Sequence, residues 1–193
     1  MRILVSRRLT LVAAGMVVAA TASAQAPASN AAPAAPPAPE VGQPAPSFTG
    51  RVADASGIKT KPVSLADYKG KVVVLAFYPG DRTSGCTAEL TKFRDEYATM
   101  FGDGVVVLGV SADSLGSHAS WAGEMKFPFA LIADPDLSIA GQYGSAMPGR
   151  KYASRTVFVV GKDGTVRYRE LRFGALNEDA YKKLAEEVAK AKS

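Results

Sequence analysis

The stretch KVVVLAFYPGDRTSGCTAEL, residues 71–90, decides the fold because it runs from a predicted strand into a predicted helix. After Lys71 the next six residues are apolar, which is typical of a buried strand. Residues 86–100 have the apolar spacing of a helix. Cys86, the only cysteine of the chain, therefore lies at a helix N-terminus. Unpaired backbone N–H groups and the positive end of the helix dipole stabilise a thiolate there, and the thiolate is the reactive form.

Strands and helices alternate on both sides of this stretch. A hairpin is predicted within residues 48–63, and further strands at residues 104–110, 129–132, 156–160 and 165–173. A helical turn is predicted at residues 64–68, and helices at residues 115–125, 137–143 and 178–192, the last capped by Asn177. This order predicts an α/β domain with three layers, in which helices cover a mixed central sheet.

The first 24 residues have the three regions of a secretory signal peptide. They begin with three arginines, continue with an apolar run over residues 9–20, and end in the small-residue pattern of residues 22–24. The apolar run is short for a bilayer span, so a cleaved signal is favoured over an uncleaved anchor. SRRLTL, residues 6–11, also looks like a twin-arginine signal, which leaves the Sec and twin-arginine routes open. The expected location is the periplasm.

Residues 25–40, QAPASNAAPAAPPAPE, lack large apolar residues and are predicted to be a disordered, extended linker. The folded domain is expected over residues 41–193. Without the three arginines of the signal, 20 of the 23 basic residues remain against 18 acidic ones, a charge of about +2. No basic block and no aromatic-basic interleaving is present, so no nucleic-acid partner is expected.

The residues around Cys86 suit thiol chemistry. Thr83, three residues earlier, is expected to bring its hydroxyl near the sulfur, where it can donate to a thiolate and accept from a substrate. Pro79 has no N–H and a fixed φ, so it can shape a pocket, and Gly85 leaves room for a small ligand. Glu89 lies one turn after Cys86 and would disfavour a thiolate unless a cation pairs with it. Glu89 therefore predicts an arginine partner.

The pattern Pro79-x-x-x-Thr83-x-x-Cys86, followed by Glu89, resembles the active-site motif of the peroxiredoxin family. The string FYPGDRTSGCT is most similar to the bacterioferritin-comigratory, PrxQ-type subgroup. The resemblance extends over nearly the whole folded part, through VGQPAPSF at residues 41–48, residues 109–134, and SRTVFVV at residues 154–160. It implies a thioredoxin-like fold and the reduction of hydroperoxides, including hydrogen peroxide, in antioxidant defence of the cell envelope.

The resemblance also assigns roles. Cys86 would be the nucleophile, and its thiolate would attack a peroxide oxygen and become a sulfenic acid. Arg155 would stabilise the thiolate and, with Thr83 and the Cys86 N–H, hold the two peroxide oxygens. Glu89 would orient Arg155, and Pro79 belongs to the same motif. No metal, flavin or haem cofactor is implied.

Three positions depart from the subgroup. Ser84 replaces the usual proline, and Arg82 replaces an apolar residue, with a solvent-facing role favoured over one in acidifying the thiol. Thr91 stands where many members have a resolving cysteine, so the single Cys86 cannot form an intramolecular disulfide. The chain is therefore expected to be a one-cysteine peroxidase, a monomer or weak homodimer. Its reductant would be an external thiol, on a thioredoxin-like protein or a low-molecular-weight compound.

Several alternatives compete with this interpretation. A lone cysteine is often an inert core residue, and the same fold can serve as a redox or binding module without peroxidase turnover. A dithiol oxidoreductase would need Cys-x-x-Cys, and Thr83 occupies the other position. One cysteine and one histidine do not make a soft-metal site. His118 is expected away from the motif in a packing or solvated role, and Trp121 and Phe127 are expected in the core.

Overall fold

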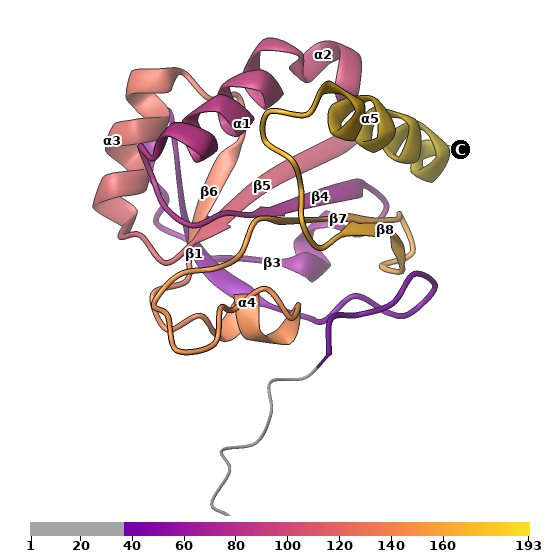
Figure 1. Ribbon diagram of the computed structural model, residues 1–193, viewed down its shortest axis with the longest axis horizontal. Coiled ribbons are helices and arrows are strands. Elements are labelled where there is room, and N and C mark those ends of the chain that lie inside the picture. The colour runs from indigo at the N-terminus through magenta and orange to yellow at the C-terminus, as the bar shows by residue number, and fades with distance from the viewer. Residues whose placement is uncertain (1–36) are drawn as a thin grey trace, which may run out of the picture. The chain divides into compact units, whose positions relative to one another are not determined.

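The computed structural model describes residues 37–193, which form a central sheet with helices on both faces (Figure 1). The predicted signal peptide and residues 25–36 of the predicted linker lie outside the described residues. The strands are β1 (Thr49–Asp54), β2 (Gly57–Ile58), β3 (Val63–Ser64), β4 (Val72–Phe77), β5 (Val105–Ser111), β6 (Ala130–Ala133), β7 (Thr156–Val160) and β8 (Val166–Glu170). The helices are η1 (Leu65–Tyr68), α1 (Ser84–Asp95), α2 (Tyr97–Met100), α3 (Leu115–Met125), α4 (Ser138–Gln142) and α5 (Glu178–Lys192).

The sheet is mixed, as predicted. Its strands run in the order β2-β1-β6-β5-β4-β7-β8, with β3 paired to β1. The central strands β4, β5 and β6 are parallel to one another, whereas β7 is antiparallel to β4, and β1 is antiparallel to β6. Every residue of β4 is buried, because helices cover the sheet on both sides. The predicted three-layer α/β architecture is confirmed.

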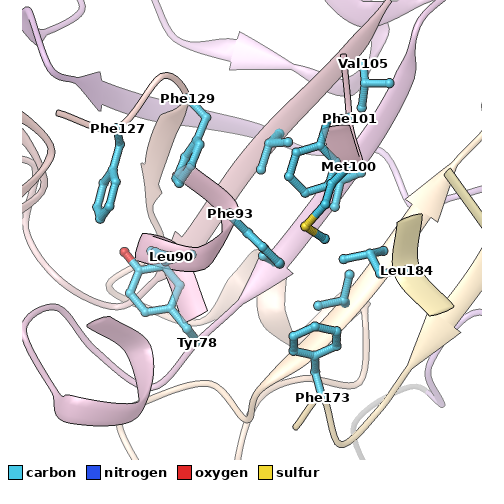
Figure 2. Packing of buried hydrophobic residues seen from close by; sticks show 14 of the residues in the cluster. Tyr78, Leu90, Phe93, Met100, Phe101, Val105, Phe127, Phe129, Phe173 and Leu184 are labelled. Atoms are coloured by element: carbon cyan, nitrogen blue, oxygen red, sulfur yellow. The ribbon is translucent and has the colours of Figure 1, made fainter. Parts of the chain in front are cut away.

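Successive residues of β4 point to opposite faces of the sheet and join different cores. Val72, Val74 and Ala76 pack with residues of α1, α2, α3 and α5 in the larger cluster, which also contains Trp121 and Phe127 (Figure 2). The three alternate residues of the strand pack on the other face with α4 and, through partly buried side chains, with η1. Cys86 belongs to the larger cluster, so the sulfur lies on the face that carries the longer helices.

The helix predicted over residues 86–100 is two helices, α1 and α2, separated at Glu96. The rings of Phe93 and Phe101 meet edge to face, with their centroids 5.3 Å apart. A straight helix would separate these two residues by about 12 Å along its axis. The break at Glu96 therefore lets both rings enter one core, which apolar spacing alone does not reveal.

The predicted strand over residues 165–173 ends early, at Glu170. The chain then leaves the sheet, and the Phe173 ring packs 5.1 Å from the Tyr181 ring of α5. The Phe173 N–H donates to the Arg155 carbonyl at 3.1 Å. This turn ties the segment after β8 to the residue that precedes β7.

The chain contacts the folded domain from residue 38, before the domain's expected first residue, Val41. Arg169 of β8 donates to the carbonyls of Ala38 and Pro39 at 3.1 and 3.2 Å, and its guanidinium also pairs with Glu40. Pro39 is buried. The last residues of the predicted linker are therefore fixed to the sheet. Over residues 37–193, no helix has the length and apolar character needed to cross a membrane.

Candidate active site

Cys86 is the third residue of α1, in the first turn of the helix that follows β4. Thr83 is the N-cap residue and has an extended backbone, and the helix begins at Ser84 without the usual proline. The Thr87 N–H already donates to the Thr83 carbonyl at 2.8 Å. The sulfur thus lies near the positive end of the helix dipole, as the sequence predicts, but Cys86 is fully buried.

Arg155 reaches this thiol from the strand next to β4, just before β7 begins. Thr156 is paired with Phe77, so the residue before β7 lies where β4 ends and the Cys86 loop begins. Arg155 Nη2 donates to Cys86 Sγ at 3.4 Å, and Nη1 donates to Glu89 Oε2 in an ion pair. The arginine partner that Glu89 predicts is therefore Arg155.

Charge in this cluster is set by burial. Burial raises the pKa of Glu89 to about 7, although the charge and hydrogen bond of Arg155 act in the opposite direction. Burial also opposes the charge of Arg155, but Glu89 and Cys86 raise the pKa of the guanidinium above its ordinary value. Glu89 Oε1 is buried and has no hydrogen-bond partner among residues 37–193. Arg155 thus stays charged, with one arm toward the sulfur and one toward a carboxyl group that is sensitive to pH.

Gly85 makes room for Arg155. A Cβ atom built on Gly85 would lie 2.9 Å from Arg155 Nη2, a distance that real Cβ atoms do not show. From the sequence, this space is expected to be left for a small ligand. In the structure the guanidinium occupies it, because the side chain of Arg155, the residue before β7, crosses the first turn of α1 to reach Cys86.

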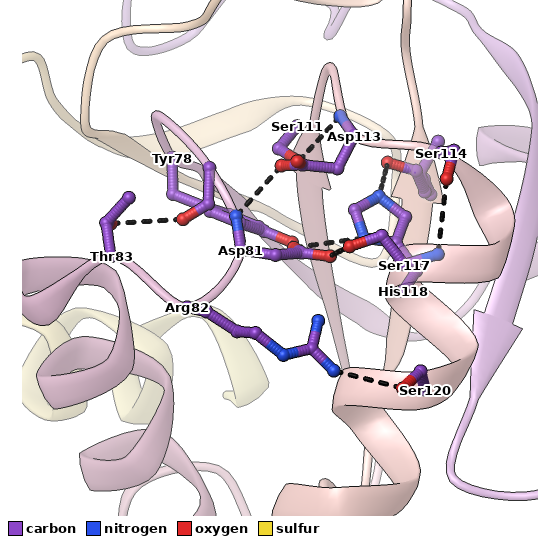
Figure 3. Close-up of polar contacts among 12 residues, drawn as sticks. Tyr78, Asp81, Arg82, Thr83, Ser111, Asp113, Ser114, Ser117, His118 and Ser120 are labelled. Carbon is purple, nitrogen blue, oxygen red and sulfur yellow. Dashed lines mark hydrogen bonds and ion pairs between the residues drawn. The ribbon is translucent and has the colours of Figure 1, made fainter.

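Thr83 and Pro79 lie in the loop between β4 and α1. Thr83 is exposed, and its hydroxyl donates to the Gly80 carbonyl at 3.1 Å (Figure 3). Within the described residues, no hydrogen bond joins this hydroxyl to Cys86 Sγ, so the predicted contact is not made in this structure. Pro79 is partly buried at the start of the loop.

Arg82 extends away from the thiol, toward α3. Its Nη2 donates to Ser120 Oγ and to Glu124 Oε2, both at 3.0 Å, and 42% of the side chain is exposed. Its φ of 60° is in the left-handed region that residues with a Cβ rarely adopt. Arg82 is therefore both solvent-facing, as favoured from the sequence, and paired with Glu124.

The prediction that His118 lies away from the motif is wrong. Its Nδ1 is 3.0 and 3.1 Å from the two carboxylate oxygens of Asp81, in the middle of the Cys86 loop, and the imidazole is fully buried. The sequence did contain a signal for this contact. Because β4 and β5 are parallel, the segments that follow them leave the same edge of the sheet, so Asp81 and the start of α3 come together.

Thr91 is partly buried on α1, and its hydroxyl oxygen has no hydrogen-bond partner in the part of the chain that the structure describes. Cys86 is a free, buried thiol. Across residues 37–193, no three side chains of the His, Cys, Asp and Glu types converge to hold a metal ion.

A buried thiol at a helix N-terminus, joined by an arginine to a carboxyl group on a thioredoxin-like sheet, defines the class of the peroxiredoxins, which are thiol-dependent peroxidases. Comparison with known proteins agrees with this class. The sequence model of the AhpC/TSA family matches residues 41–169, about two thirds of the chain, and the chain belongs to that family.

Relatives within the family point to one subgroup. Peroxiredoxin bcp of Coxiella burnetii is 41% identical over 133 residues, which cover 66% of this chain and 85% of the relative. Chloroplastic peroxiredoxin Q of Sedum lineare is 37% identical over 132 residues, 65% of this chain and 66% of the relative. The crystal structure of peroxidoxin BcpB from Mycobacterium tuberculosis superposes with a TM-score of 0.68 at 26% identity, covering 80% of this chain and 99% of that one. The chain is thus a peroxiredoxin similar to the bcp and Q proteins, with a single cysteine.

Proposed function

We propose that Cys86 reduces hydrogen peroxide and organic hydroperoxides through a sulfenic acid. The observation that carries the proposal is the contact of Arg155 Nη2 with Cys86 Sγ at 3.4 Å, at the N-terminus of α1. A fixed guanidinium and a helix dipole both favour a thiolate, and the thiolate is the nucleophile. An inert core cysteine would need neither a charged neighbour nor the buried carboxyl group of Glu89 behind it.

The reaction balances as a two-electron oxidation of sulfur. The Cys86 thiolate attacks one oxygen of the peroxide, a sulfur–oxygen bond forms and the oxygen–oxygen bond breaks. The other oxygen leaves with the electron pair, takes a proton and departs as water or an alcohol. Arg155, the Cys86 N–H and the Thr83 hydroxyl would stabilise the charge that develops on the oxygens. Glu89 holds the second arm of Arg155, and Pro79 borders the loop.

Access to the sulfur favours small substrates. Cys86 is fully buried, whereas 18% of the Arg155 side chain is exposed. The exposed residues nearest in sequence are Thr83 and Ser84, at the start of α1. A peroxide would therefore enter over this first turn, with the Thr83 hydroxyl turning from the Gly80 carbonyl toward the substrate.

Reduction must come from outside the chain, because Cys86 is its only cysteine. A thiol attacks the sulfenic sulfur, water leaves, and a mixed disulfide forms; a second thiol then releases Cys86 as a thiolate. The second thiol and the first are oxidised to a disulfide. We assign the reductant to a thioredoxin-like protein or a low-molecular-weight thiol, and the active form to a monomer or weak homodimer.

The proposed setting is the periplasm, where the enzyme would protect the envelope. The support is the signal-like sequence of residues 1–24. Fractionation of cells that express the full chain, with the N-terminus of the product determined by mass spectrometry, tests this part. Cleavage after residue 24 and recovery from the periplasm are expected, and a full-length cytosolic product would refute it.

Dimedone trapping tests the activity. Reduced protein is treated with one equivalent of hydrogen peroxide in the presence of dimedone, and the adduct is located by peptide mass spectrometry, with Cys86→Ser as the control. An adduct on Cys86 in most chains is expected. The alternative is a redox or binding module without peroxidase turnover. The full burial of Cys86 is the observation that favours it. That alternative would be established by a thiol that stays unmodified while a known peroxidase in the same mixture is oxidised.

A further inference from the structure

A buried contact between Asp81 and His118 joins the Cys86 loop to α3 (Figure 3). Asp81 lies five residues before Cys86, between β4 and α1, and His118 lies in the first turns of α3. The exposed fractions of the two side chains are 3% and 0%. Among the described residues, no hydrogen bond joins either of them to Cys86 Sγ, and the chemistry proposed above does not use them.

The contacts of His118 determine its protonation. Nδ1 faces the Asp81 carboxylate, and Nε2 lies 3.2 Å from the Ile132 carbonyl oxygen of β6. Both partners are acceptors, and a neutral imidazole has only one N–H to donate. Only the doubly protonated ring satisfies both contacts. A buried ring that left one of them unmade would lose a hydrogen bond in a site that water does not reach.

The contacts of Asp81 match a carboxylate. Besides His118, it accepts a hydrogen bond from Ser117 Oγ at 2.6 Å and from the Tyr78 hydroxyl at 2.8 Å. Burial acts to raise the pKa of Asp81, but the hydrogen bond and charge of His118, together with these hydroxyls, hold it below its usual range. Burial raises the pKa of Tyr78 well above its usual range, so its hydroxyl stays a donor.

We propose that Asp81 and His118 form a carboxylate–imidazolium pair that positions the Cys86 loop for the reaction with peroxide. This role rests on the peroxidase function proposed for Cys86. The two residues act through the loop, which they fix between the end of β4 and the start of α1, so they are positioning residues. A loop held in one place keeps Thr83 and the first turn of α1 in line with Arg155, and small displacements of such groups slow a reaction strongly.

The main chain of the loop is fixed by the same surroundings. The Asp81 N–H donates to Asp113 Oδ2 at 2.9 Å, and that oxygen also accepts from Ser111 Oγ at 2.7 Å. Farther along α3, Arg82 is held by Ser120 and Glu124. Helix α3, along most of its length, and the segment before it therefore hold residues 81 and 82 in place.

The groups around the pair come from several elements. Tyr78 directly follows β4, Ser111 is the last residue of β5, and the carboxylate of Asp113 comes from the segment after β5. Helix α3 itself contributes Ser117, and β6 contributes the Ile132 carbonyl. The exposed Arg82–Glu124 pair lies about two turns farther along α3. The positive charge of the imidazolium thus offsets the negative charges of the Asp81 and Asp113 carboxylates.

The two contacts of His118 depend on both ring protons. A neutral imidazole has a single N–H, which can serve either Asp81 or the Ile132 carbonyl, and one of the two contacts is then lost. The doubly protonated ring is therefore the form that fixes the loop.

Nuclear magnetic resonance of the imidazole tests the protonation without using activity. His118 is the only histidine of the chain, so its two ring nitrogens can be assigned in protein labelled with nitrogen-15. Nitrogen shifts of an imidazolium, with a proton on each nitrogen, are expected at pH 7. A neutral ring with one protonated nitrogen at pH 7 would overturn the pair.

Kinetics test the positioning role. In Asp81→Asn and His118→Gln, peroxide oxidation of Cys86 is expected to slow by about tenfold or more. Alkylation by iodoacetamide should change much less, because it does not depend on aligned peroxide-binding groups. Ser117→Ala removes one hydrogen bond to Asp81 but leaves the pair, so it should slow the peroxide step by less.

The outcomes separate the two proposals. Wild-type peroxide rates in both pair variants would overturn the positioning role alone. An equal loss in the peroxide and iodoacetamide reactions would also overturn it, since that is the result of a general loss of structure. No reaction of the wild type with any peroxide would overturn the function of Cys86, whatever the imidazole spectrum shows. If His118→Gln does not fold, Asp81→Asn and Ser117→Ala, together with the imidazole spectrum of the wild type, give the answer.

Discussion

Gly85 and Arg155 lie so close together that a Cβ on Gly85 would stand 2.9 Å from Arg155 Nη2. The guanidinium therefore reaches Cys86 only because residue 85 has no side chain. Gly85 is the second residue of α1, where alanine would otherwise favour the helix by up to about 1 kcal/mol. The steric cost thus falls on Arg155 rather than on the helix.

Gly85→Ala is predicted to separate activity from stability. The displaced guanidinium should slow peroxide oxidation of Cys86 by about a hundredfold, while the free energy of unfolding stays within about 1 kcal/mol of the wild type. Gly116→Ala is the matched control, because Gly116 is the second residue of α3 and its Cβ would meet only Ser114 Oγ at 3.9 Å. Urea unfolding and stopped-flow oxidation measure both quantities. Equal peroxide rates in the two alanine variants would contradict the assignment.

Arg155→Met is predicted to slow the peroxide step by about a hundredfold to a thousandfold, because it removes both the thiolate contact and a donor to the developing charge. Arg169→Met on the neighbouring strand β8 is the control for losing a partly buried arginine that binds backbone carbonyls. Its peroxide rate should equal that of the wild type. A small, similar change in both variants would show that Arg155 is not part of the reaction.

Glu89 predicts how stability depends on pH. Its pKa is raised from 4.5 to about 7 in the folded state, chiefly by burial, so the folded chain binds this proton more tightly than the unfolded chain. The stabilisation is complete below about pH 4.5 and is lost as the pH rises through 7, an effect on the order of 3 kcal/mol. Urea unfolding of the wild type and Glu89→Gln from pH 4 to pH 8 measures it. The wild type should lose stability relative to the variant across this range, and parallel curves would contradict the prediction.

Thr91 offers a test on stability alone. Its buried hydroxyl oxygen lacks a hydrogen-bond partner among the described residues, so replacing it with a methyl group of similar shape removes a desolvation cost. Thr91→Val is predicted to raise the free energy of unfolding by about 1 kcal/mol, and peroxide oxidation of Cys86 should not change. Thr99→Val is the control, because the Thr99 hydroxyl donates to the Glu96 carbonyl at 3.0 Å and should not gain stability when removed. A loss of stability in Thr91→Val would refute this interpretation.

The elements with the clearest patterns were predicted to the residue, including β4, α3, β7 and α5. Their periodicity is local, so the sequence contains it directly. The break at Glu96 and the early end of β8 depend on aromatic rings from different elements that meet in the core, as Phe93 does with Phe101 and Phe173. Local patterns do not report such contacts.

At the site, too, local features were predicted and contacts between distant segments were not. The pairing of Glu89 with an arginine followed from charge near a thiol, and the identity of that arginine as Arg155 came from the family resemblance. The contact of His118 with Asp81 and the reason for Gly85 were not predicted, because both depend on how two segments of the chain meet in space. Thr83 illustrates a further limit, since its distance from Cys86 in sequence did not predict that its hydroxyl binds Gly80.

The most direct test of the central claim is the second-order rate constant for oxidation of Cys86 by hydrogen peroxide, measured by stopped flow beside the alkylation of the same thiol by iodoacetamide. The account predicts oxidation at least about a thousandfold faster than that of a small free thiol, with ordinary alkylation, because the fixed groups act on peroxide oxygens. A Cys86 that reacts with peroxide no faster than a free thiol would contradict the account.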